Sequence, residues 1–214
     1  MIRRCAGCLT ILIVMLTGLP ADAGPLHPRT ILLVGSPDRL ARYWHDQRWV
    51  EGDTYACALY AQASVLEALG YDFDAELAAA RESGLRDGWF EPDVGSMGLG
   101  QPLRAHKILF EAFGSPVAKD LTPDRALRRL HRELAAGHFA VTNLDAQQLA
   151  HYRGSAIKWH TLWITGMHLD THGLPLSVIA NDSYRGAAVE YPISEFLAAW
   201  GTPEFNFYAI FVHP

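Results

Sequence analysis

Apolar residues in the first half of the chain follow the spacing of helices. Over residues 55–69 they recur every three or four positions and Gly70 follows, which predicts a helix that ends there. Three further helices are predicted on the same grounds, over 74–83, 102–113 and 123–136. We expect Gly84 to end the first of these, and Thr122 and Pro123 to form the N-cap and first position of the last.

After Gly137 the pattern changes to short apolar runs that are rich in β-branched and aromatic residues. Gly, Pro, Asn or Asp bounds each run, which is typical of strands. The predicted strands cover 138–143, 160–169, 176–181 and 205–212. The remaining elements are a first strand over 30–34, a helical turn within 37–49, a loop over 86–101 and a short helix over 194–200. This order predicts an α+β fold, in which a helical N-terminal half packs on a mostly antiparallel C-terminal sheet.

The first 23 residues have the three regions of a secretory signal peptide. Two arginines, Arg3 and Arg4, precede an apolar run over 9–19, and Ala21 and Ala23 form a cleavage site of the A-x-A type. The run is short for a membrane span, although a retained anchor is the alternative. We therefore expect residues 24–214 to form a single exported domain, periplasmic or secreted, with no stable membrane insertion after cleavage.

Composition narrows the range of partners. The chain has a formal net charge of −5 and no basic run, which argues against nucleic acid and anionic membrane surfaces. Its ten histidines show no HExxH pair or other recognisable ligand spacing, so we expect neither a metal site nor a cofactor.

The cysteines are few and their positions are informative. Cys5 and Cys8 lie in the signal segment, so the mature chain keeps one thiol, Cys57, at the start of the first long helix. An unpaired cysteine in an exported protein indicates a reactive thiol or intermolecular pairing, and the alternative is an inert buried thiol. Because unpaired N–H groups at a helix start favour negative charge, this position lowers the pKa of a thiol.

A catalytic thiolate also needs an imidazole and a group that orients the imidazole. His160 is the best candidate for the imidazole, because it opens the predicted strand "HTLWITG" where a side chain can face a cleft. The next strand ends in Asn181 and Asp182, and antiparallel pairing would bring one of them beside His160. The sequence leaves both candidates open.

The ordered series of motifs resembles papain-like cysteine peptidases, most closely the group that removes double-glycine leaders from bacteriocins, and its secreted relatives. The matching stretches are the helix from Cys57 to Gly70, "AAGHFAVTN", the strand from His160 to Gly166, "IANDSYRG" and the pair Phe196 and Trp200. The resemblance implies a papain-like fold, a peptide or protein substrate and catalysis by Cys57, His160 and Asp182, with Asp182 preferred over Asn181 as the orienting residue.

Two positions depart from the pattern of that family. The family carries a glutamine six residues before the cysteine, whose amide binds the oxyanion, but Glu51 occupies that position here. Gln47, ten residues before Cys57, is the substitute that we expect. Ser183 replaces a proline after Asp182 and removes no chemistry.

Three functions fit these observations. The leading one is a cysteine peptidase or amidase, in which Cys57 forms a thioester, His160 acts as base and Asp182 orients His160. An acyl or γ-glutamyl transferase would use the same residues with an amine acceptor. The third is a non-catalytic binding module on a decayed peptidase scaffold, and Glu51 is the residue that favours it.

Overall fold

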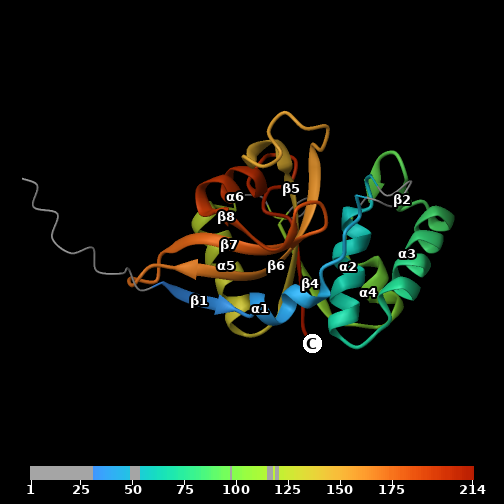
Figure 1. Cartoon of the computed structure of the whole chain (residues 1–214), viewed down its shortest axis with the longest axis horizontal. Helices are drawn as coiled ribbons and strands as arrows, with labels where there is room; N and C mark the ends of the chain where they lie inside the picture. Colours follow the sequence, from blue (N-terminus) through green and yellow to red (C-terminus); the bar gives the residue numbers. More distant parts are fainter. Residues whose placement is uncertain (1–30, 49–53, 97, 115–117, 119–120) are drawn as a thin grey trace, which may run out of the picture.

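The fold is α+β and is organised around one seven-stranded sheet (Figure 1). The computed structural model describes residues 31–48, 54–96, 98–114, 118 and 121–214, so the expected signal segment 1–23 and Glu51 lie outside the described residues. The helices are α1 (Pro37–Leu40), α2 (Cys57–Ala68), α3 (Phe73–Asp87), α4 (Gln101–Ala105), α5 (Pro123–Ala135) and α6 (Ile193–Trp200), with 3-10 turns at Ala41–Tyr43 and Ala146–Gln148.

The sheet is antiparallel at every pairing of the described residues. Its strands are β1 (Leu32–Gly35), β4 (Phe110–Phe113), β5 (Phe139–Asp145), β6 (Trp159–Leu169), β7 (Pro175–Asp182), β8 (Gly186–Pro192) and β9 (Ala209–Val212). Their order is β4-β9-β5-β6-β7-β8, and β1 pairs with residues 166–169 of β6. A separate two-stranded ribbon joins β2 (Phe90–Glu91) and β3 (Gly95–Ser96).

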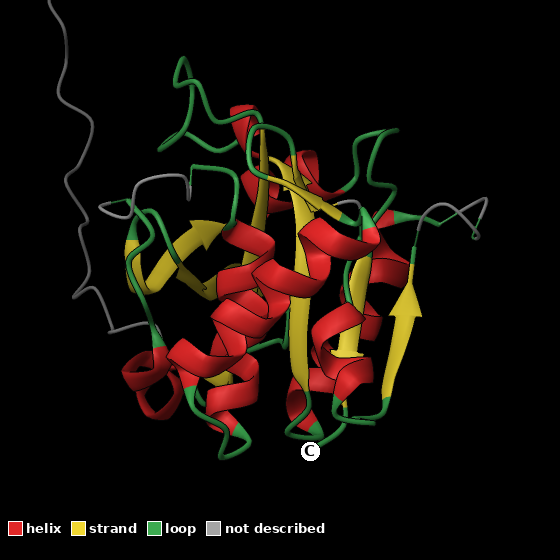
Figure 2. Ribbon diagram, turned by 90° about the vertical axis from the view of Figure 1, so that its right-hand side faces the viewer, coloured by secondary structure: helices red, strands yellow, loops and turns green. Residues whose placement is uncertain are grey.

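Helices cover both faces of the sheet. Helices α2 and α4 pack on one face of the sheet, and α3 packs on the outer side of α2. These helices therefore lie in front of the strands in the view of Figure 2. The opposite face is covered by α5 and α6 (Figure 1). Successive residues of one strand serve the two cores: Trp163 packs under α2, whereas Leu162 and Ile164 pack under α5 and α6. The two-sided burial explains why β6 reads as a continuous apolar run.

Four of the predicted helices are present, as α2, α3, α5 and α6. Helix α2 lies within the predicted range, and α5 begins after Thr122, whose Oγ1 accepts a hydrogen bond of 3.3 Å from the Arg125 N–H. Helix α3 is longer than predicted, because Gly84 does not end it. A Cβ at Gly84 would lie 2.6 Å from the Phe90 Cβ, so this glycine lets β2 pack against the helix. The helix ends instead at Gly88, whose φ is 72°.

The predicted helix over 102–113 is wrong. Helix α4 stops at Ala105, and after Lys107 at a φ of 59° the chain continues as strand β4. Pairing of β4 with the distant β9 determines this conformation, and local spacing cannot show it. Strand β8 and the β2–β3 ribbon were also not predicted, and the last strand begins at Ala209 rather than at residue 205. Within the described residues, every helix is too short or too polar to span a bilayer.

Candidate active site

Cys57 is the first residue of helix α2 and is partly exposed. Its thiol donates a hydrogen bond of 3.6 Å to Thr161 Oγ1, and that hydroxyl donates in turn to Asn143 Oδ1 at 2.7 Å. Helix α2 is apolar on nearly all sides, because it is held between the sheet and α3. The packing of this helix therefore places the thiol near the C-terminal end of β5 and the N-terminal end of β6.

His160 and Asp182 form a buried pair beside this thiol. Cys57 and His160 line the same cleft, and each affects the pKa of the other. His160 Nε2 is 2.9 Å from Asp182 Oδ1, and both side chains are fully buried. His160 Nδ1 has no hydrogen-bond partner within the part of the chain that the structure describes. The ring can therefore exchange a proton with the thiol through Nδ1 while Asp182 holds Nε2.

Asp182 receives an unusual number of donors. The Tyr152 hydroxyl lies 2.8 Å from Oδ1 and 2.7 Å from Oδ2, and the Tyr191 hydroxyl donates to Oδ2. The backbone N–H groups of Tyr184 and Arg185 donate to Oδ1 at 2.8 and 3.2 Å. These contacts fix the carboxylate in one orientation and satisfy its buried charge.

Asn181 points away from the histidine. Its Nδ2 donates to the Leu40 carbonyl at 2.8 Å, and its Oδ1 accepts from the Ala188 N–H at 3.2 Å. Neighbouring residues of a strand face opposite sides, so only one of Asn181 and Asp182 can reach His160. The structure brings Asp182 to that position.

The charges of the site favour a thiolate and an imidazolium. Burial alone would raise the pKa of Cys57, but the interaction with the His160 imidazole and the Thr161 contact lower that pKa below the usual value of a thiol. Burial alone would lower the pKa of His160, but the Asp182 carboxylate raises it. The same pairing, against the effect of burial, lowers the pKa of Asp182.

Gln47 is buried near this centre. Its N–H donates to the Ser183 carbonyl at 3.1 Å, its Oε1 accepts from the Ser183 hydroxyl at 2.5 Å, and its Nε2 lies 3.4 Å from the Thr54 carbonyl. These contacts hold the Gln47 side chain between the residue after Asp182 and the segment before Cys57. Gln47 does not border the cleft described next.

A cleft of about 320 Å³ opens over the thiol. Cys57, His160 and Thr161 lie along it, and the two-stranded ribbon, through Val94 and Gly95, supplies one side. Three of the other lining residues are aromatic: Tyr55, Trp159 and Phe205. The cleft has the size and the mainly apolar wall of a site for a small organic group or a side chain.

Three contributors to the site were not predicted. The first is Trp159, which lines the cleft: 51% of it is exposed and its indole N–H donates to Glu204 Oε2 at 3.0 Å. Tyr152 lies in the loop before β6 and Tyr191 lies in β8, and neither shows a pattern that predicts contact with Asp182. His168 lies at the far end of β6, where its ring is 3.1 Å from Glu190, away from Cys57.

Comparison with known proteins adds no relative. A scan against models of protein families finds no match to this chain, and a search of curated proteins finds none either.

Proposed function

We propose that this chain is an exported cysteine peptidase or amidase of papain-like fold that acts on a peptide or protein substrate. One observation carries the proposal: a thiol at a helix start lies in an open cleft beside an imidazole that a buried carboxylate holds. A structural cysteine needs none of these neighbours, and their arrangement is the one that nucleophilic catalysis requires.

The proposed reaction begins with the Cys57 thiolate and the His160 imidazolium. The sulfur attacks the carbonyl carbon of the scissile amide, and a tetrahedral oxyanion forms. The imidazolium gives its proton to the leaving nitrogen, so the C–N bond breaks and a thioester remains. A water molecule then gives a proton to His160 and attacks the thioester, which releases the acid and restores the thiol–imidazole pair.

The backbone N–H of Cys57 would bind the oxyanion. This N–H belongs to the first turn of α2, where N–H groups have no partner within the helix. The Gln47 amide would be a second donor only after its Nε2 leaves the Thr54 carbonyl and turns to the cleft. A single donor of this kind typically contributes about 10²–10³-fold in rate. A second donor from Gln47 would therefore raise the rate by a factor of that size.

Alkylation of Cys57 by iodoacetamide at neutral pH tests the proposed ion pair. We expect the mature chain to react faster than free cysteine, and His160→Ala to remove this advantage. His168→Ala is the matched control, because it removes another carboxylate-bound histidine of the same strand. Equal rates for the native chain and free cysteine would contradict an activated thiol.

Hydrolysis of a peptide library tests the reaction itself. We expect cleavage by the native chain, none by Cys57→Ala, and a loss of about 10²–10⁴-fold for His160→Ala. A rapidly alkylated Cys57 without any cleavage would favour the transferase, which ligation to an added amine would reveal. An unreactive thiol together with peptide binding would favour the non-catalytic module.

A further inference from the structure

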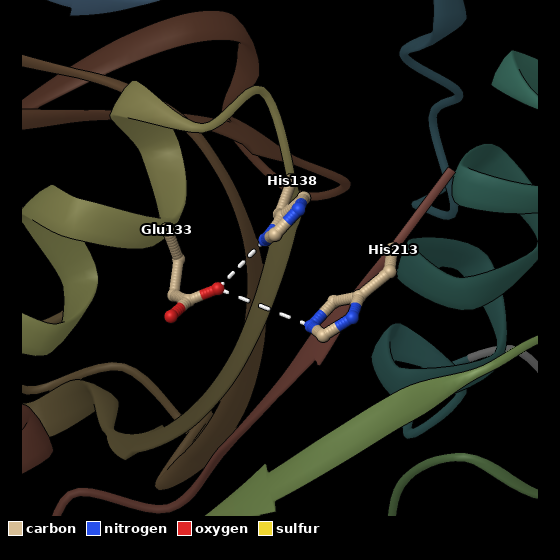
Figure 3. Close-up of side chains that lie close together, drawn as sticks. All are labelled: Glu133, His138 and His213. Atoms are coloured by element: carbon tan, nitrogen blue, oxygen red, sulfur yellow. Dashed lines mark hydrogen bonds and ion pairs between the residues drawn. The ribbon is translucent and has the colours of Figure 1, made fainter.

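A second cluster of ionisable side chains lies at the opposite end of strand β5 from the cleft. It consists of Glu133 of helix α5, His138 just before β5 and His213 just after β9 (Figure 3). One potential ligand atom from each residue lies within 4.8 Å of the other two. None of these residues takes part in the proposed reaction.

The carboxylate of Glu133 is oriented by contacts on both of its oxygens. Oε1 accepts ion pairs from Arg129 Nε at 2.7 Å and Arg132 Nε at 3.4 Å. Oε2 faces the imidazoles instead, 2.7 Å from His138 Nδ1 and 3.9 Å from His213 Nε2 (Figure 3). Burial alone would raise the pKa of Glu133, but His138 and Arg129 lower it, so the carboxylate is ionised at neutral pH.

The imidazoles are open to solvent on one side. Exposed fractions of their side chains are 27% for His138 and 41% for His213, against 7% for Glu133. The two rings stack with centroids 4.2 Å apart and planes 21° from parallel. Because a metal lies in the plane of the ring that binds it, joint ligation requires one ring to turn. His213 has the freedom to do so, as it follows the last strand and is the more exposed of the two.

We propose that Glu133, His138 and His213 bind a divalent transition-metal ion of the zinc class. Two imidazole nitrogens and one carboxylate oxygen suit zinc, cobalt or nickel, whereas magnesium and calcium prefer sites built from oxygen alone. Water would complete the coordination on the exposed side. Arg129 contacts the other oxygen of the Glu133 carboxylate. This contact fixes the orientation of the carboxylate, but the positive charge of Arg129 also weakens the attraction of the site for a cation.

The metal would join two parts of the chain that are distant in sequence. His213 lies at the C-terminal end of β9, and Glu133 and His138 flank the turn between α5 and β5. Binding would therefore hold the segment after β9 against this turn. It would also raise the melting temperature, because a ligand of the folded state stabilises that state.

Titration of the untagged mature chain with Zn²⁺ tests the proposal, with calorimetry and thermal unfolding as readouts. We expect one ion to bind per chain and the melting temperature to rise. His213→Ala and His138→Ala should each weaken binding by at least roughly tenfold, since the loss of even an outer contact of a metal site costs about 10–100-fold.

Two controls separate this cluster from other zinc-binding groups. His172→Ala removes an exposed histidine of the turn between β6 and β7 and should leave binding unchanged. Cys57→Ala removes the thiol of the cleft and should also leave it unchanged. Absence of binding at millimolar Zn²⁺, binding that persists in a His138→Ala/His213→Ala double variant, or binding lost in Cys57→Ala would each overturn the proposal.

Discussion

Thr161 controls the charge of the proposed nucleophile more directly than any other neutral residue. Its hydroxyl lies 3.6 Å from the Cys57 sulfur, and this contact helps to lower the pKa of the thiol. When Cys57 is protonated, its thiol donates to this hydroxyl, which donates to Asn143. When the thiol loses its proton, rotation of the hydroxyl can turn the same group into a donor to sulfur.

Thr161→Val is expected to move the acid limb of Cys57 reactivity to higher pH. Valine keeps the shape but cannot donate, so the pKa of the thiol rises by about one unit, the equivalent of a weak hydrogen bond to a charged group. The rate of iodoacetamide alkylation, followed from pH 5 to 9, measures this limb. Thr161→Ser keeps the hydroxyl and should retain the native profile; identical profiles for valine and serine variants would refute the role.

Tyr152 is expected to stabilise the fold through the Asp182 charge. Tyr152→Phe removes a hydroxyl that contacts both carboxylate oxygens, and it should lower the free energy of unfolding at neutral pH by about 1.5–3 kcal/mol. Urea unfolding measures the change. Tyr71→Phe, at a tyrosine that is 37% exposed, is the control and should stay within about 0.5 kcal/mol of the native chain.

The sequence identifies the proposed reacting residues better than the residues around them. Cys57 is recognisable because it is a lone thiol at a helix start, and His160 because it opens a strand. Tyr152 precedes His160 by eight residues in an irregular loop, where no period of two or 3.6 applies. Its contact with Asp182 arises only from the folding of the loop onto the sheet, so the sequence pattern does not reveal it.

At the level of elements, close approach of backbones positions β1 and α1. Gly35 ends β1 at a φ of 89°, and a Cβ there would lie 2.4 Å from the Thr165 carbonyl oxygen of β6. The next residue, Ser36, donates its N–H to the same oxygen at 3.0 Å. The glycine thus allows the chain to turn off the sheet directly into α1.

Gly35→Ala should lower the free energy of unfolding by about 2–4 kcal/mol, as the sum of left-handed strain and a backbone clash. Gly173→Ala is the matched control, because Gly173 has a φ of 78° with nothing within 4 Å of a Cβ. This control isolates the strain, about 1–2 kcal/mol. Urea unfolding of both variants gives the comparison, and equal losses would show that the clash is relieved.

Elements with local signals are the ones that the sequence predicts correctly. Helix α5 has a capping threonine, a proline at its first turn and an apolar stripe, all within its own residues. Strand β8 has a glycine, two alanines and a glutamate, and it becomes a strand by pairing with β7. The wrong prediction of a helix where β4 lies has the same origin, since the partner strand β9 lies about a hundred residues away in the sequence.

For the whole molecule, we expect stability to fall on acidification. Asp182 and Glu133 are buried carboxylates whose pKa values are lowered in the folded state. The stabilisation is present above the unfolded pKa of about 4 and is lost as pH falls through the lowered folded values. The melting temperature, measured from pH 7 to 3, should therefore decrease below about pH 5. A constant melting temperature over this range would contradict the charge assignments.

The position of β9 affects how the chain can be completed. Strand β9 lies between β4 and β5, so within the described residues it alone joins β4 to the rest of the sheet. A nascent polypeptide cannot close this sheet until residues 209–212 have been synthesised. Nonsense mutations that remove β9 would therefore leave two unpaired strand edges, on β4 and on β5, and we expect aggregation as their outcome.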